Sequence, residues 1–183
     1  MNVYESCPTF TTEHLTIRPV RREDAAGLLT VYSDPRAQAL FNADNCTSNF
    51  CYTRLPEMVE CLNMWIWSYE HGYFVRWTIL HEDLPVGTVE MFHRDDGEDG
   101  RGRGVLRIDL SSRYEYEKAI DELLGGILPA MHELFGCAQV LTKTFAASPA
   151  RSGALRRHGF VPAPGAVRLH DGTFAGDYWV HRA

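Results

Sequence analysis

The spacing of apolar residues in the first part of the chain alternates between a strand-like and a helical period. Apolar and polar residues alternate over residues 15–19, which predicts a strand. Apolar residues then recur every three or four positions until Asp34-Pro35, which predicts a helix over about 25–32. A second helical stretch covers residues 56–71, and Gly72 supplies its stop signal.

The middle of the chain has the pattern of a β-meander. Residues 73–80 are rich in aromatic and β-branched side chains, and residues 86–92 and 105–110 repeat this strand pattern. A turn at 83–85 and a glycine-rich hairpin loop at 95–104 separate them. Three consecutive antiparallel strands are therefore expected.

The last third alternates helix and strand. Its strongest helical pattern covers residues 120–135, where Gly125, Gly126 and Pro129 are expected to weaken or kink the helix. The remaining elements are a strand over 140–144, a short helix over 149–157 closed by His158, and a last strand over 177–181.

This order of elements predicts an α+β fold in which a mixed β-sheet is flanked by helices. The chain has 183 residues, of which 45% are hydrophobic, enough for a sizeable core and too many for a disordered chain. No internal repeat, linker or low-complexity tract divides it. We expect one domain over residues 1–183, with its core at about 13–182.

Charge and cysteine content narrow the possible partners. With 18 Lys and Arg against 24 Asp and Glu, the net charge of -6 has the wrong sign for binding the phosphate backbone of nucleic acid. No leader pattern and no apolar run of about 18 residues is present, so we expect a cytoplasmic protein without a membrane partner. Odd in number and without a C-x-x-C pair, the cysteines predict reduced thiols and no metal site: Cys7, Cys46, Cys51, Cys61 and Cys137.

Sequence motifs exclude several enzyme classes. No G-x-S-x-G motif supports a serine hydrolase, and no Walker or dinucleotide loop is present. Gly100, Gly102 and Gly104 imitate part of a phosphate loop, but they precede a strand rather than open a helix. The histidines are scattered without the spacing of metal ligands.

Four local patterns carry a resemblance to a known family. They are Leu-Thr-Ile-Arg-Pro at 15–19, the pair Trp-Thr-Ile at 77–79 and Pro-Val-Gly-Thr-Val at 85–89, Leu110 before a turn and long helix, and Leu-Arg-Arg-His-Gly-Phe at 155–160. In this order they resemble the GCN5-related N-acetyltransferases (GNAT), in particular the branch that acetylates ribosomal-protein N-termini and small amines.

The resemblance implies a GNAT-like acyl-CoA N-acyltransferase fold over nearly the whole chain. It further implies acetyl transfer from acetyl-CoA to a primary amine of a small molecule or a peptide N-terminus, by direct attack on the thioester, and a possible homodimer. The residues that it places at the acetyl-CoA site are Leu110, Ser111, Arg113, Tyr116, Glu117, Lys118 and Ala119.

Two departures from the family pattern favour an alternative. The turn after the predicted acetyl-CoA strand lacks the family's glycines and carries Glu115 and Glu117, which would repel a phosphate; only Arg113 and Lys118 could offset them. Ser148 stands where the family usually has asparagine, and Arg151 where serine is usual. The alternative is a ligand-binding or protein-interaction module that no longer binds acetyl-CoA.

The candidate catalytic residues are Glu90, Asp109 and Ser148. The two carboxylates lie on central predicted strands and could accept the amine proton. A solvent-facing or salt-bridged strand residue is the favoured interpretation of Glu90, whereas for Asp109 the two interpretations stay equally open. Candidate substrate-binding residues are Trp65, Trp67 and His93. Because Trp65 and Trp67 are two positions apart on a helix, at most one is core and the other is exposed or in the cleft.

Overall fold

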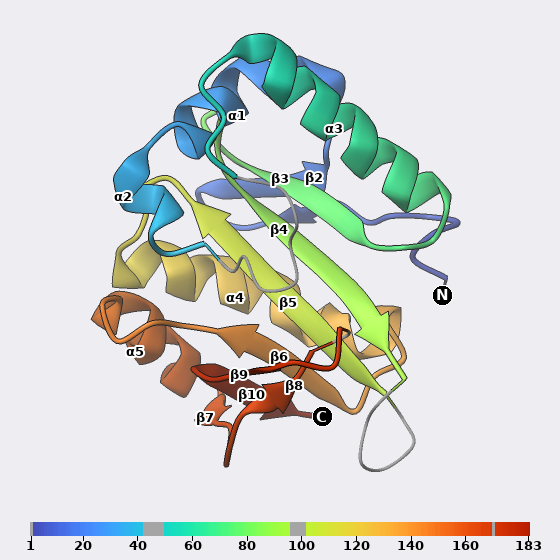
Figure 1. Ribbon diagram of the computed structural model, residues 1–183, viewed down its shortest axis with the longest axis vertical. Helices are drawn as coiled ribbons and strands as arrows, with labels where there is room; N and C mark the ends of the chain where they lie inside the picture. Colours follow the sequence, from blue (N-terminus) through green and yellow to red (C-terminus); the bar gives the residue numbers. More distant parts are fainter. Residues whose placement is uncertain (1, 42–49, 96–101, 170) are drawn as a thin grey trace.

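The computed structural model describes residues 2–41, 50–95, 102–169 and 171–183. Eight of its strands share one sheet (Figure 1). In sheet order they are β1 (Phe10–Thr11), β2 (Leu15–Pro19), β3 (Val75–His81), β4 (Leu84–Arg94), β5 (Arg103–Leu110), β6 (Gln139–Lys143), β10 (Tyr178–Arg182) and β7 (Val161–Pro162).

The sheet is mixed, as predicted, and its one parallel pairing among the described strands joins β5 to β6. That pairing covers Arg103 to Val105 against 139–141. Beyond Val105, β5 continues to Leu110 and β6 continues to Lys143 without pairing to each other. The two central strands therefore part toward their carboxyl ends.

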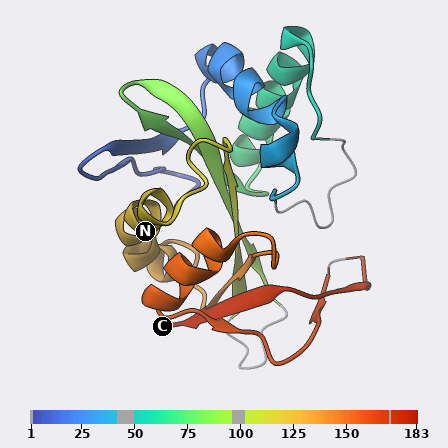
Figure 2. The same cartoon turned by 90° about the vertical axis from the view of Figure 1, so that its left-hand side faces the viewer.

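Helices cover both faces of the sheet. Figure 2 shows α1 (Ala25–Tyr32) and α3 (Leu55–Glu70) on one face, and α4 (Glu117–Leu134) and α5 (Pro149–Arg157) on the other. The larger apolar core lies between the sheet and the α4–α5 pair, and a second core packs α1 against α3. The mixed sheet flanked by helices confirms the predicted fold class.

The structure adds short elements that the periodicity analysis missed. A strand period needs at least about four residues to be recognised and a helical period about eleven, and these elements are shorter. They are β1, β7, the one-turn helix η1 (Arg22–Asp24), the helix α2 (Pro35–Gln38) and a separate two-stranded sheet of β8 (Val167–Arg168) and β9 (Phe174–Ala175).

The helix α4 continues through the positions expected to weaken or kink it. Pro129 lies within it, and both glycines are helical. A Cβ atom at Gly126 would lie 2.5 Å from Cγ2 of Thr12, so glycine there allows the loop before β2 to approach the helix backbone. Packing outweighs the low helix propensity of these residues.

A histidine pair ties β10 to α4. His132 Nδ1 lies 2.9 Å from the carbonyl oxygen of Cys137, and His132 Nε2 lies 2.8 Å from His181 Nδ1. Since a carbonyl only accepts, His132 Nδ1 carries the proton, and His132 Nε2 accepts from His181 Nδ1. Burial lowers the pKa of His181, and the proximity of His132 and His158 lowers it further.

Two further findings concern the apolarity of the helices and the state of the cysteines. Across the described residues, every helix falls short of the length and apolarity that a bilayer crossing demands. Cys7 and Cys137 are free thiols, whereas Cys46 and Gly100 lie outside the described residues.

Candidate active site

Glu90 and Asp109 lie on neighbouring strands of the sheet centre. Glu90 on β4 pairs with Arg107 on β5, and Thr88 pairs with Asp109. Side chains two residues apart on a strand share a face, so all four project toward α1 and α3. Both carboxylates belong to residues that are only 3% exposed.

Arg76 of β3 joins these groups into one buried network. Its Nε donates to Glu90 at 3.1 Å, and its Nη2 also contacts Glu90. Its Nη1 donates to the Tyr32 hydroxyl at 2.9 Å, to Thr88 at 3.0 Å and to Asp109 Oδ2 at 3.3 Å. The Trp65 ring covers the guanidinium at 4.0 Å, which makes Trp65 a buried wall of the network.

Glu90 is a salt-bridged strand residue. Arg107 Nη1 donates to its Oε1 at 2.8 Å, while Arg76 holds its Oε2. Burial alone would raise the pKa of Glu90, but Arg76 and Arg107 outweigh burial and hold that pKa below its ordinary value. A carboxylate held in this way is a weak proton acceptor.

Asp109 has the properties that Glu90 lacks. Its Oδ2 accepts from Tyr32 at 2.8 Å, whereas its buried Oδ1 has no hydrogen-bond partner among the described residues. Burial raises the pKa of Asp109 in spite of the opposing effect of Arg76. The residue lies four positions beyond Val105, where β5 has already left β6.

A buried ion pair fills the place where β5 and β6 part. Arg151 of α5 is 2% exposed, and its Nε and Nη2 each donate to one oxygen of Glu115 at 2.8 Å. Its Nη1 donates to the carbonyl oxygens of Ile108 at 2.9 Å and Leu40 at 3.2 Å. Leu40 follows α2, on the face of the sheet opposite α5. To contact it, the guanidinium of Arg151 extends through the gap between β5 and β6.

Ser148 supports this ion pair. As the N-cap residue of α5, its hydroxyl accepts from the amide of Arg151 at 3.3 Å and donates to Glu115 Oε1 at 3.1 Å. Ser148 is 3% exposed, and its hydroxyl is engaged by Arg151 and Glu115 within the protein.

The turn before α4 holds the residues expected at the acetyl-CoA site. Glu117 pairs with Arg157 of α5, so the carboxylate at this helix start already has a cationic partner. The amide of Ser111 donates to the carbonyl of Val86 at 2.9 Å. Leu110 and Ala119 are buried, Ser111 is half-buried, and the exposed residues are Arg113, Tyr116, Glu117 and Lys118.

Two of the candidate substrate-binding residues lie away from Asp109. Trp67 is 48% exposed on the outer side of α3 and stacks on His71 at 4.1 Å between ring centres. His93 lies five residues along β4 from Thr88, a strand length of about 17 Å, and its Nδ1 contacts the carbonyl oxygen of Phe135 at 2.8 Å. The structure therefore brings only Trp65 to the network.

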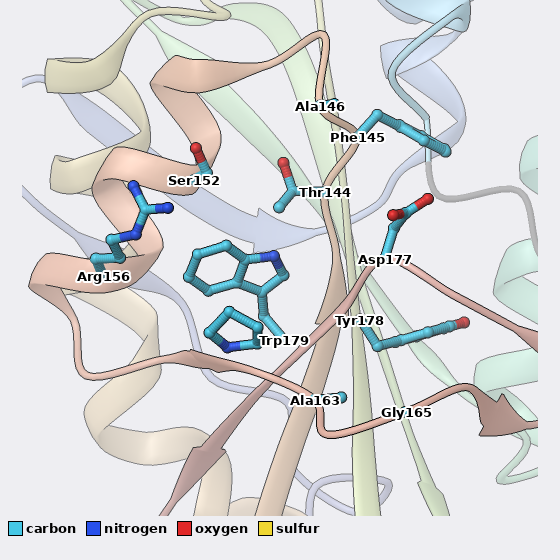
Figure 3. Close-up of a pocket in the computed structure, with 11 residues that line it drawn as sticks. Thr144, Phe145, Ala146, Ser152, Arg156, Ala163, Gly165, Asp177, Tyr178 and Trp179 are labelled. Atoms are coloured by element: carbon cyan, nitrogen blue, oxygen red, sulfur yellow. The ribbon is translucent and has the colours of Figure 1, made fainter.

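An open cavity of about 390 Å³ lies between α5 and β10 (Figure 3). The Trp179 ring lines the middle of this cavity, with Arg156 and Ser152 of α5 on one side and Asp177 on the other. Arg156 lies 5.2 Å from that ring. No group of three or more His, Cys, Asp or Glu side chains in the described part of the chain could hold a metal ion.

Three polar residues of the network were missed by the sequence analysis. Tyr32 ends an apolar helical stripe and had the pattern of a core residue. Thr88 lies in a strand pattern that threonine commonly fills. Arg76 had a signal, because it is a lone charge inside the otherwise uncharged, buried run of β3.

Comparison with known proteins identifies the family. The profile of the acetyltransferase (GNAT) domain matches residues 14–161, which is most of the chain. The protein therefore belongs to the GNAT acetyltransferase family. No match was found among curated proteins.

Solved structures with the same fold include ribosomal-protein acetyltransferases. RimL, a ribosomal L7/L12 α-N-protein acetyltransferase in complex with coenzyme A, aligns with a TM-score of 0.69 at 12% identity over 96% of this chain and 98% of its own. RimJ of Mycobacterium smegmatis, in complex with a CoA disulfide, aligns at 0.72 and 12% identity over 96% of this chain and 88% of its own.

An acetyltransferase from Salmonella typhimurium that modifies the N-terminal serine of L7/L12 aligns at 0.66 and 12% identity, over 94% of this chain and 96% of its own. At these identities the likeness concerns the fold. RimL is itself a member of the branch that the sequence motifs resemble.

Proposed function

We propose that this protein transfers an acetyl group from acetyl-CoA to a primary amine, and that the amine is the N-terminus of a peptide or protein. Family membership supports the acetyl transfer, and the similarity to RimL and RimJ supports the acceptor class. The observation that carries the proposal is the Oδ1 of Asp109, which is buried where β5 has left β6 and has no hydrogen-bond partner in the described part of the chain.

The chemistry assigned to the chain is proton transfer and positioning. A protonated amine cannot attack, and burial raises the pKa of Asp109, which makes its Oδ1 a better acceptor for the amine proton than an ordinary carboxylate. Tyr32 and Arg76 hold Oδ2 and so fix the direction of Oδ1. The amine nitrogen then attacks the thioester carbon, and the C–S bond breaks. The leaving thiolate takes the second proton, which the nitrogen loses as the amide forms, and Asp109 passes the first proton to solvent.

Replacing Asp109 by Asn tests this role. The amide cannot accept the proton, so kcat should fall by about 10²- to 10⁴-fold while the Kd for acetyl-CoA stays unchanged. The kcat of the unmodified protein should also decline as the pH falls through the raised pKa of Asp109. Release of the CoA thiol with a free-amine peptide gives the rate, and calorimetry gives the Kd. An Asp109→Asn variant with full activity would exclude Asp109 as the base.

A second function is favoured by one observation, the Arg151–Glu115 pair. It fills the space between β5 and β6, and acetyl-CoA could enter that space only if the pair moved. The second candidate is a protein that has kept the fold, lost donor binding, and serves as a ligand-binding or interaction module.

Thermal melting separates the two candidates. With 1 mM acetyl-CoA, a Kd of 10 μM would stabilise the protein by about 2.7 kcal/mol, or about 5–11 °C for a chain of this size. That shift in the unmodified protein supports the transferase. No shift in the unmodified protein, with a shift in the double variant Arg151→Ser/Glu115→Gln, supports the module.

A further inference from the structure

A second cavity, of about 420 Å³, lies between β8 and the face of the sheet formed by β5, β6 and β10. Among the described residues that line it are Arg103, Arg168 and Arg182, and no aspartate or glutamate. In a chain with a net charge of -6, three arginines around one cavity form a local exception to the acidic surface.

The strand register explains why two of these arginines line the same cavity. Arg103 of β5 pairs with Gln139 of β6, and Gln139 pairs with Arg182 of β10. The three side chains therefore form one row across neighbouring strands, with the two arginines about 10 Å apart at two strand spacings. Arg168 of β8 lines the cavity as the third arginine.

The floor of the cavity beside this row is apolar. Leu141 and Val180 pair with each other across β6 and β10, and Val167 of β8 packs in the same buried cluster. A positively charged row beside an apolar floor suits a segment that carries both carboxylates and hydrocarbon. A nucleic-acid backbone would instead need a continuous positive track.

The cavity lies on the face of the sheet that also holds Asp109. Arg103, Val105, Arg107 and Asp109 alternate along β5 and so project to one side. Six residues of strand separate Arg103 from Asp109, a distance of about 20 Å. An extended peptide covers that distance with about six residues.

We propose that this cavity is an acceptor subsite for acidic side chains of a polypeptide. The carboxylates bind Arg168, Arg182 and Arg103 by charge-assisted hydrogen bonds. Which residues of the peptide carry those carboxylates rests on the proposed function. If the N-terminal amine lies at Asp109, acidic residues at about positions six to eight of the peptide reach the arginines.

Binding tests the subsite without any acetyl transfer. The probe is a fluorescent, N-terminally acetylated 12-residue peptide with glutamates at positions six to eight, compared with its glutamine counterpart. We expect the glutamate peptide to bind at least about tenfold more tightly, with a salt-sensitive Kd. Equal binding of the two peptides overturns the proposal.

Charge-reversal variants locate the binding. Arg168→Glu and Arg182→Glu should each weaken glutamate-peptide binding about tenfold or more, whereas Arg22→Glu, an exposed arginine of η1, should not. Should either variant fold poorly, Arg168→Gln and Arg182→Gln remove the charge alone and should weaken binding in the same direction. A labelled 12-nucleotide oligouridine that binds the unmodified protein and is lost in the same variants would assign the cavity to nucleic acid and overturn the proposal.

Acetylation of peptides with a free N-terminal amine tests where along the peptide the acidic residues must stand. A peptide with glutamates at positions six to eight should show a lower KM than an isomer with glutamates at two to four, and Arg182→Glu should remove the difference. Equal KM values for the two isomers overturn the positional part. If no peptide is acetylated but charge-dependent binding persists, the proposed function fails while the acidic-peptide subsite stands.

Discussion

The buried pair of Arg151 and Glu115 gives a stability prediction that the structure allows us to quantify. The side chains are 2% and 8% exposed, and two parallel hydrogen bonds of 2.8 Å join them. Replacing Arg151 by Ser leaves a buried carboxylate without its counterion and removes the donor of two backbone carbonyls. We expect a loss of about 3–5 kcal/mol in the free energy of unfolding.

The partner variants separate the pair from its components. Glu115→Gln keeps one acceptor oxygen for Arg151 and should cost less, about 1.5–3 kcal/mol. The double variant leaves neither charge behind, so its cost should fall short of the sum of the two single costs by about 2 kcal/mol. This coupling is the signature of a direct buried interaction.

Urea unfolding followed by tryptophan fluorescence measures all three variants. A matched control is Arg157→Ser on the same helix, where the arginine is 45% exposed and pairs with Glu117 and Asp121 in solvent. This control should leave the midpoint nearly unchanged. The reasoning is refuted if Arg151→Ser behaves like the control, or if the single costs simply add.

Two other predictions concern packing and pH. Gly126→Ala places a methyl group 2.5 Å from Cγ2 of Thr12. In a urea titration this variant should be destabilised by about 1–3 kcal/mol, in spite of the higher helix propensity of alanine. A gain in stability would show that the loop around Thr12 moves aside at no cost. The pKa of His181 is lowered, so the folded state binds its proton less readily than the unfolded chain, and unfolding free energy should fall as the pH drops below about 6.5. Unfolding curves at pH 7.5 and 5.5 should show a smaller loss for His181→Asn; an equal loss would place the sensitivity elsewhere.

Periodicity predicted the fold because its main elements are long enough to show a period. The meander of β3, β4 and β5 and the helices α3, α4 and α5 lie where the apolar spacing indicated, within a few residues. The two-residue strands β1, β7, β8 and β9 give no period, and tertiary pairing alone creates them. The arginine cavity depends on β8, so sequence reasoning could not have found it.

The site was predicted in part. Alternation along β4 and β5 correctly placed Glu90 and Asp109 on central strands, but it could not distinguish them. Their difference comes from Arg107, Arg76 and Tyr32, and the last two reach the carboxylates from elements distant in sequence. The sequence identified Arg151 as a departure from the family pattern, yet only its contacts with Glu115 and two backbone carbonyls reveal that it fills the parting of the strands.

The short parallel pairing has a mechanical consequence. Within the one sheet, strands β1 to β5 form one antiparallel block and β6, β10 and β7 form another, and among the described residues the two blocks pair at three positions. Bending the molecule at this seam disturbs far fewer backbone hydrogen bonds than bending either block. The blocks are therefore held together less by backbone pairing than by the apolar core beneath α4 and α5, which contains residues of both blocks, among them Val89 and Val140.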